Sequence, residues 1–288
     1  MQNKIAITTD SAADMPENIL ERYGVSLIPL HIVLDGKSRR DGIEITPAEL
    51  CRECRESGDI PKTSAVTIGE YIDVFKSYTD EGTAVVHLSL SAEISSTYQN
   101  ACIAAAEVGN VYVVDSKSLC AAIGLLVIKA CEMREQGLSA PEIAEKLSAL
   151  RERVVTTFII DKLDFLYKGG RCSAVSAFGA NILGIKPSIE MESGKLSVGK
   201  KYRGKFESCC AQYVSDLLEA HSGEIDTDRC IIAYTVEVPD AVEDILRKEI
   251  KRHCKFKEVL ISHPGCTITS HCGPTTAAVF FMKKQSGA

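Results

Sequence analysis

The segment AVVHLSLSAEISST, residues 84–97, is the most informative part of this sequence about its fold. Its first seven residues are mostly apolar and predict a buried β-strand over Ala84–Leu90. Three consecutive hydroxyl residues, 95–97, follow the strand, and such residues are preferred where a helix begins. The segment therefore predicts a strand, a polar turn and a helix over 96–107, which together form one unit of an α/β sheet.

The same pattern recurs at two other predicted strands. Ile5–Thr8 leads into Asp10–Ser11, and Val111–Val114 leads into Asp115–Ser116. In an open α/β sheet, ligands bind beyond the carboxyl ends of the strands. A helix that begins there offers unpaired N–H groups and a partial positive charge. We therefore expect a small anionic ligand held by hydroxyls and backbone N–H groups, rather than a metal ion or a nucleophilic triad.

The rest of the chain predicts two parts of different architecture. Strands alternate with helices up to about residue 155, which implies parallel strands joined by crossover helices. Beyond that point, a hairpin with Gly194 in its turn and a mixture of strands and helices predict an α+β part. The predicted fold class is α/β, with a parallel-sheet N-terminal domain (residues 1–155), an α+β C-terminal domain (residues 156–288) and the ligand site between them.

Individual elements follow from periodicity and from capping signals, in which a serine or threonine precedes a glutamate by three residues. These signals are Thr46 with Glu49, Thr67 with Glu70, and Ser139 with Glu142. The predicted strands are Ile5–Thr8, Ser26–Val33, Ala84–Leu90, Val111–Val114, Val155–Ile160, 188–191, 195–201, 230–236, 257–262 and 276–282. The predicted helices are 16–23, 47–57, 68–80, 96–107, 118–136, 141–152, 162–167, 174–184, 205–220 and 240–253.

Composition limits the classes of function. The chain is 45% hydrophobic and 25% charged, which is typical of a soluble globular protein. A formal charge of −6 gives no general basic field to attract phosphates, so nucleic acid is not an expected partner. No apolar run reaches the roughly 18 to 20 residues that cross a bilayer. Met1–Lys4 leads directly into a strand, so we expect no signal peptide and a cytoplasmic protein.

The twelve cysteines mostly occupy apolar positions of predicted helices and strands. In a cytosolic protein they would be reduced and would pack as small core residues. Cys51 and Cys54 form a Cys-x-x-Cys pair, but no second cysteine or histidine pair with zinc-site spacing accompanies them. We therefore expect no metal site.

Several polar segments have both a structural and a functional interpretation. Thr63 and Ser64 lie in a polar turn, and Lys168–Arg171 ends a helix, where glycine is the expected stop. The basic cluster Lys200–Lys205 is most simply a solvated face, although arginine can bond two oxygens of one anion. His271 lies in a loop before the final predicted strand and could donate a hydrogen bond to an anion. No Gly-x-Ser-x-Gly elbow is present, which argues against a catalytic triad.

Taken in order along the chain, a set of short segments resembles the DegV family of bacterial lipid-binding proteins. The resemblance runs from about Ile5 to Met282, which is nearly the whole chain. It rests on these segments: Asp10–Asp14, Ile28–Leu30, Lys62–Ser64, Leu90–Tyr98, Asp115–Ser116, Leu166–Arg171, Ile185–Pro187, Arg203–Lys205 and His271–Pro274.

The resemblance implies a two-domain fold that holds a long-chain fatty acid between the domains, without any other cofactor. It also implies that the protein is a carrier and not itself an enzyme. Such proteins are the acyl-carrying subunits of bacterial fatty acid kinase, which supplies phospholipid metabolism. They present the carboxylate to a separate ATP-binding subunit, which forms the acyl phosphate. The resemblance is also compatible with transient contact between the protein and a membrane surface.

The resemblance also assigns roles to individual residues. It implies that Thr63, Ser95 and His271 bind the carboxylate, and that Arg203 serves the kinase-coupled step. The neighbours of the head group would be Ser64, Ser96 and Thr97. The chain departs from the family pattern in three places: Ser96 replaces a glycine, the loop 63–67 lacks a proline, and Thr275 replaces the second glycine of Gly-Pro-Gly. These changes bear on head-group geometry more than on the fold.

The residues leave other functions open. The main alternative is a hydrolase or transferase that acts on an acyl or phosphorylated small molecule, with Ser95 as nucleophile and His271 as base. A third interpretation is a redox or metal sensor that uses the cysteines. For the leading function, we expect the stretch Phe178–Ile185 and neighbouring helices to line an apolar tunnel.

Overall fold

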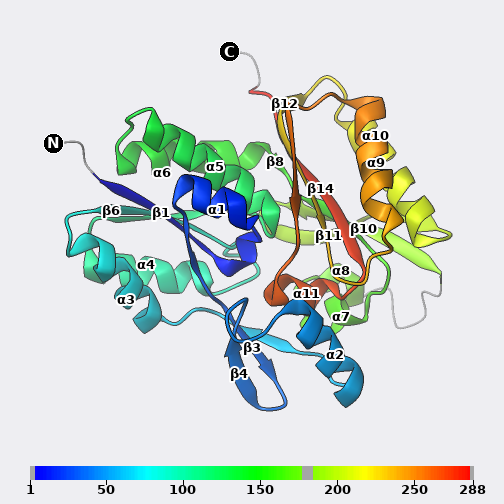
Figure 1. Cartoon of the computed structure of the whole chain (residues 1–288), viewed down its shortest axis with the longest axis horizontal. Coiled ribbons are helices and arrows are strands. Elements are labelled where there is room, and N and C mark those ends of the chain that lie inside the picture. The colour runs from blue at the N-terminus through cyan, green and yellow to red at the C-terminus, as the bar shows by residue number, and fades with distance from the viewer. Residues whose placement is uncertain (1–3, 177–183, 286–288) are drawn as a thin grey trace.

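The computed structural model describes residues 4–176 and 184–285, whose strands form three β-sheets (Figure 1). The first sheet is parallel, with strand order β2-β1-β6-β7. A small antiparallel sheet has the order β4-β3-β5, and a mixed sheet has the order β11-β10-β9-β14-β12-β13, with β8 paired to β14. The strands are β1 (Ile5–Asp10), β2 (Ser26–Ile28), β3 (His31–Leu34), β4 (Lys37–Arg40), β5 (Lys62–Ser64), β6 (Ala84–Ser89), β7 (Val111–Asp115), β8 (Val154–Val155), β9 (Thr157–Ile160), β10 (Ile185–Glu192), β11 (Lys195–Arg203), β12 (Ile225–Tyr234), β13 (Glu258–Ser262) and β14 (Thr276–Lys283).

Helices cover both faces of the first sheet and the outer face of the mixed sheet (Figure 1). In the first sheet, α3 and α4 pack on one face and α5 and α6 on the other, while α9 and α10 cover the mixed sheet. The helices are α1 (Glu17–Tyr23), α2 (Pro47–Ser57), α3 (Ile68–Thr79), α4 (Thr97–Val108), α5 (Ala121–Glu135), α6 (Ala140–Leu150), α7 (Asp164–Gly169), α8 (Ser173–Ser176), α9 (Phe206–Ala220), α10 (Ala241–His253) and α11 (Cys266–Cys272). None of the helices within the described ranges is long and apolar enough to cross a membrane.

Helix α5 joins the two halves of the core. Nearly all of its residues from Ala121 to Cys131 are buried, because it packs on β1 and β6 on one side and on β12 and β14 on the other. A helix that is apolar all round is expected where no face meets water. Gly124 lets it approach closely, since a Cβ there would lie 3.3 Å from the Cγ of Met15. One cluster of buried apolar residues therefore continues from the parallel sheet into the mixed sheet.

The predicted fold class is confirmed, with a parallel sheet in the N-terminal part and a mixed sheet with helices in the C-terminal part. The three capping signals form the predicted capping boxes at the starts of α2, α3 and α6. The hairpin is also present, with Ser193 and Gly194 at positive φ between paired Glu192 and Lys195. The division into domains at residue 155 stays a prediction.

Three predicted elements are wrong, and a fourth begins at a different residue. The single strand Ser26–Val33 is two strands in different sheets, because Pro29 has no N–H with which to continue the ladder. The segment around Thr63 is strand β5 and not a turn, and His271 lies in helix α11 and not in a loop. Helix α5 begins at Ala121 instead of residue 118. Of the predicted helix 174–184, residues 177–183 lie outside the described ranges, as does most of the expected tunnel lining Phe178–Ile185.

Candidate functional site

A cavity of about 260 Å³ lies where residues of both halves of the chain meet, and we call it the hydroxyl-lined cavity. Its lining is Leu30, Thr63, Ser64, Ala65, Leu90, Ile94, Ser95, Ser96, Leu119, Leu166, Arg171, Leu196, Thr267, Ile268, His271 and Cys272. Ser64, Ser96 and Arg171 are exposed and form its mouth. Leu90 and Leu119 are buried and belong to its inner end. The cavity therefore has a polar mouth and a mostly apolar interior.

Two of the residues that were predicted to bind the carboxylate are in contact with each other in this cavity. The Oγ1 atom of Thr63 lies 2.8 Å from Nε2 of His271. Pairing of β5 with β3 places Thr63 opposite Ile32, which fixes the threonine beside α11. The structure thus brings together two residues that are 208 positions apart in the sequence.

Helix α11, which carries His271, is held at its first turn by two buried aspartate side chains from the N-terminal half. Asp41 accepts hydrogen bonds from the backbone N–H groups of Cys266 (2.8 Å) and Thr267 (3.1 Å). Asp14 accepts one from the N–H of Gly265 at 2.7 Å. The first N–H groups of a helix have no partner within the helix, and negative charge is favoured there. The carboxylates therefore fix the position of the helix and, with it, of the histidine.

His271 is a neutral imidazole at neutral pH. Burial disfavours the charged ring, and the positive charge of Arg171 adds to this effect, so the pKa of His271 is lowered to about 4. Its Nδ1 atom is buried and has no hydrogen-bond partner among the described residues. One ring nitrogen therefore contacts Thr63 while the other faces the protein interior.

Gly169 makes room for this ring. A Cβ at position 169 would lie 2.4 Å from Nδ1 of His271, which is closer than real contacts allow. From the sequence alone, both glycines of Lys168–Arg171 are expected to end a helix. Only Gly170, with φ +67°, ends α7 in the left-handed conformation. One glycine is enough to end the helix, so the presence of a second one is the sequence signal that could have identified Gly169.

The structure places Ser95 at the cavity wall and also at the start of α4. Its Oγ atom lies 2.6 Å from Oγ1 of Thr97 and accepts a hydrogen bond from the backbone N–H of Thr97 at 3.2 Å. Both interpretations of this residue, capping and binding, are therefore compatible with its position. Ser96 is exposed at the mouth, whereas Thr97 is fully buried and does not line the cavity.

The loop that carries Ser95 is held by its neighbours on both sides. Asp10, which is fully buried, accepts a hydrogen bond from the N–H of Leu90 at 2.9 Å and another from Tyr71. The Ser91 hydroxyl donates to the carbonyl of Gly194 (2.9 Å) at the tip of the β10–β11 hairpin. The polar residue Asp10 at the end of β1 therefore positions the loop and does not line the cavity.

The two arginines of interest lie in different places. Arg171 lines the mouth of the hydroxyl-lined cavity, and its Nη1 donates to the carbonyl of Gly169 at 2.7 Å. The sequence did not single it out, although an arginine next to two glycines is a pattern that suits anions. Arg203 is exposed at the end of β11 and does not line the cavity. It lies seven residue steps along β11 from the cavity residue Leu196, which corresponds to roughly 23 Å of extended strand.

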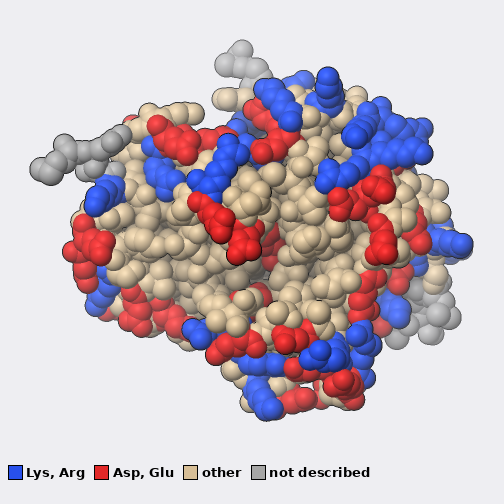
Figure 2. All heavy atoms as spheres, in the orientation of Figure 1, with Lys and Arg blue, Asp and Glu red and all other residues tan. Residues whose placement is uncertain are grey.

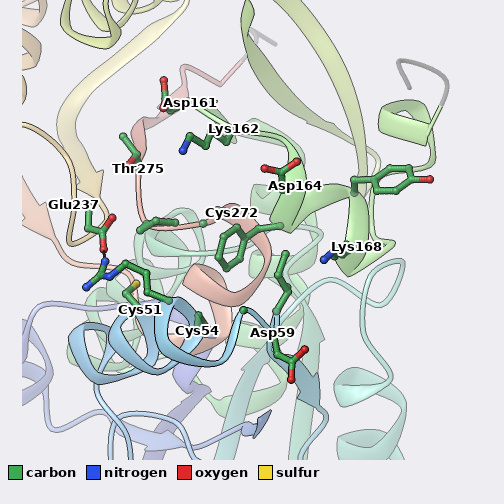
Figure 3. A pocket seen from close by; sticks show the side chains of 17 residues that line it. Cys51, Cys54, Asp59, Asp161, Lys162, Asp164, Lys168, Glu237, Cys272 and Thr275 are labelled. Atoms are coloured by element: carbon green, nitrogen blue, oxygen red, sulfur yellow. Dashed lines mark hydrogen bonds and ion pairs between the residues drawn. The ribbon is translucent and has the colours of Figure 1, made fainter. Parts of the chain in front are cut away.

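A second, larger cleft of about 500 Å³ lies on the other side of α7 and α11, next to α2 (Figure 3). Acidic and basic side chains, including Asp164 and Lys168, surround it, and the ion pair between Arg55 and Glu237 is drawn as a dashed line (Figure 3). Cys272 lines both spaces. This cleft lacks the group of hydroxyls and the buried histidine, so the hydroxyl-lined cavity is the better candidate for an anion.

The face of the molecule in Figure 2 carries both basic and acidic side chains. On the face shown in Figure 2, lysine and arginine side chains alternate with acidic ones around the margin, and uncharged residues occupy most of the centre.

Ten of the cysteines are buried, and no disulfide joins any two of them. Within residues 4–176 and 184–285, no group of three or more histidine, cysteine, aspartate or glutamate side chains could hold a metal ion.

Comparison with known proteins gives a consistent result. The model of the DegV family, described as a family of uncharacterised proteins, matches residues 4–284. A DegV domain-containing protein of Clostridium acetobutylicum is 33% identical over 283 residues, covering 98% of this chain and 99% of that protein. Two solved structures are also similar. One is a fatty-acid-binding DegV family protein from Thermus thermophilus (29% identity, 98% of this chain and 100% of that one, TM-score 0.88), and the other is a stearic-acid-binding protein from Eubacterium ventriosum (27% identity, 97% and 98%, TM-score 0.86).

Proposed function

The chain belongs to the DegV family, and given this membership we propose that it binds a long-chain fatty acid in the hydroxyl-lined cavity. The observation that carries the proposal is the distribution of residues in the cavity lining, with hydroxyls and an arginine at the mouth and buried leucines inside. A fatty acid has the same division into a charged head group and an apolar chain.

The apolar interior supplies most of the affinity in this proposal. Burial of each methylene group contributes roughly 0.8 kcal/mol, so even a few carbons outweigh one hydrogen bond. The head group then sets the orientation, because the charged carboxylate must stay where donors and water can reach it.

Thr63 is well prepared to donate to this carboxylate. A neutral imidazole carries one N–H, and when that hydrogen is on Nε2, His271 donates to the Thr63 oxygen. The hydroxyl hydrogen of Thr63 is then free to point at an anion in the cavity. Ser95 supplies a second donor, because its oxygen can accept from the N–H of Thr97 while its hydrogen points at the ligand. The lowered pKa of His271 keeps this arrangement constant across neutral pH.

The protein acts, in this proposal, as the carrier subunit of a fatty acid kinase. The exposed mouth of the cavity leaves the carboxylate accessible to an ATP-binding partner subunit, and Arg171 can neutralise the negative charge that grows there when the acyl phosphate forms. Arg203 is exposed and remote from the cavity, so its role is contact with the partner.

Nothing in the geometry favours the alternative of an enzyme with Ser95 as nucleophile. The described contacts pair Ser95 with Thr97, and His271 with Thr63, so the proposed nucleophile and base do not meet. A histidine whose pKa is about 4 is also a weak general base at neutral pH.

The test is mass spectrometry of lipid extracted from the natively purified protein, followed by titration with palmitate. We expect close to one fatty acid per chain and tight binding after delipidation. Thr63→Val is the matched variant, because it removes the hydroxyl but keeps the shape of the side chain, and it should weaken palmitate binding. Absence of any extracted fatty acid, together with no uptake of palmitate, would refute the proposal.

A further inference from the structure

Thr267 is a polar residue in the interior of the hydroxyl-lined cavity that the proposed head-group contacts do not use. The residue is only 2% exposed, and it lines the cavity together with the buried residues Leu30 and Leu119. The Oγ1 atom of Thr267 has no hydrogen-bond partner among the described residues. Its backbone N–H, by contrast, is bonded to Asp41.

Other hydroxyls on the same helix are satisfied within the protein. Thr269 Oγ1 donates to the carbonyl of Pro264, and Ser270 Oγ donates to the carbonyl of Cys266 at 2.7 Å. Buried polar groups in proteins almost always have a partner, and each exception needs an explanation. On α11, Thr267 carries the unpartnered hydroxyl and His271 the unpartnered ring nitrogen, and both residues line the cavity.

The position of Thr267 relative to the head group is set by the helix. Thr267 and His271 are four residues apart, so they lie on the same face of α11 and about 6 Å apart along its axis. An extended acyl chain advances about 1.3 Å per carbon, given C–C bonds of about 1.5 Å. An acyl chain that runs from His271 along α11 would therefore pass Thr267 about four or five carbons from the carboxylate.

We propose that the Thr267 hydroxyl makes this protein selective for fatty acids that carry an oxygen substituent on the acyl chain near the carboxylate, hydroxy fatty acids being the simplest class. The proposal rests on the proposed function, since it assumes that the carboxylate lies at Thr63 and His271. A saturated chain that fills the interior covers the hydroxyl without offering it a partner, which is unfavourable. A hydroxyl on the chain can both donate to and accept from Thr267, which removes this penalty.

The experiment compares palmitate with 5-hydroxypalmitate by titration calorimetry on delipidated protein. The wild type should bind 5-hydroxypalmitate roughly 10-fold more tightly than palmitate, which is the size of effect expected for one buried hydrogen bond. Thr267→Val keeps the shape of the side chain and should abolish or reverse this preference. Thr267→Ser keeps the hydroxyl and should retain it.

Two controls isolate the cause. Thr269→Val makes the same chemical change on the same helix, away from the cavity lining, and should leave the preference unchanged. The positional control is 16-hydroxypalmitate, whose hydroxyl is at the far end of the chain and should gain nothing from Thr267.

The outcomes separate this inference from the proposed function. If the wild type binds both fatty acids equally, or if Thr267→Val leaves the ratio of affinities unchanged, the selectivity proposal is wrong although fatty acid binding stands. If neither fatty acid binds to the wild type, the proposed function itself is wrong.

Discussion

Replacing Gly169 by alanine sets two opposing effects against each other. Gly169 is the last residue of α7, and alanine is favoured over glycine in a helix by up to about 1 kcal/mol, so propensity alone predicts a more stable protein. The new Cβ, however, would lie 2.4 Å from Nδ1 of the buried His271 ring. Forcing extra atoms into a packed interior costs about 1 to 3 kcal/mol. We therefore expect Gly169→Ala to destabilise the protein by up to about 2 kcal/mol.

The same substitution should weaken ligand binding. The ring can escape the new methyl group only by turning, which breaks its 2.8 Å contact with Thr63. Thr63 then loses the donor that leaves its own hydroxyl hydrogen free for the carboxylate. The bond from Thr63 to the carboxylate is one to a charged group and is worth about 1.5 to 3 kcal/mol, so palmitate affinity should fall by roughly 10- to 100-fold. Thermal unfolding and titration calorimetry on the same preparations measure the two effects.

Gly170→Ala is the matched control for this experiment. Gly170 has φ +67°, so alanine there is strained by about 1 to 2 kcal/mol, but no atom lies within 4 Å of the added Cβ. This variant should lose stability and keep its palmitate affinity. A Gly169→Ala protein that melts above the wild type and binds palmitate normally would show that the ring does not rest against α7.

Three further outcomes are expected. Ser95→Ala should lower palmitate affinity by one to two powers of ten and cost about 1 kcal/mol of stability through the lost hydrogen bond to the first N–H of α4, whereas unchanged affinity in calorimetry would leave Ser95 with this structural role only. Arg203→Ala should keep palmitate affinity but reduce phosphorylation by the partner kinase, and equal loss of both would place Arg203 in the lipid site. Burial raises the pKa of Asp14 from 3.8 to about 7, so the folded protein holds a proton that the unfolded chain releases above pH 4. Stability should therefore fall between pH 4 and 7 by up to about 1.4 kcal/mol per pH unit relative to Asp14→Asn, and parallel curves in denaturant titrations of the two proteins would contradict this.

Long periodic segments made most of the fold predictable. The buried strand Ala84–Leu90 and the capped helices follow from local patterns that packing then reinforces. The short polar strands β4 and β5 were missed because they carry few apolar residues, and their pairing depends on β3. Tertiary contacts decided those cases.

Helix α11 could not be predicted from its own residues. Its sequence, CTITSHC, is rich in β-branched and small polar residues that disfavour helix. Its first N–H groups are satisfied by Asp41 and Asp14, which are more than 220 positions away in the sequence. The site depends on this helix, so the meeting of Thr63 with His271 came only from the resemblance, and Gly169 and Thr267 were not foreseen at all.

Strand β14 is central in the mixed sheet but is synthesised late, and this affects when the sheet can be completed. This strand lies between β9 and β12 in the mixed sheet, and it follows all the other described strands in the sequence. His271 precedes it by only a few residues. A chain still emerging from the ribosome therefore has neither a complete mixed sheet nor the contact between Thr63 and His271 until synthesis has passed both elements. In the proposed function, binding of a fatty acid therefore requires a chain that has been synthesised past β14, and a shorter nascent chain would not hold the lipid.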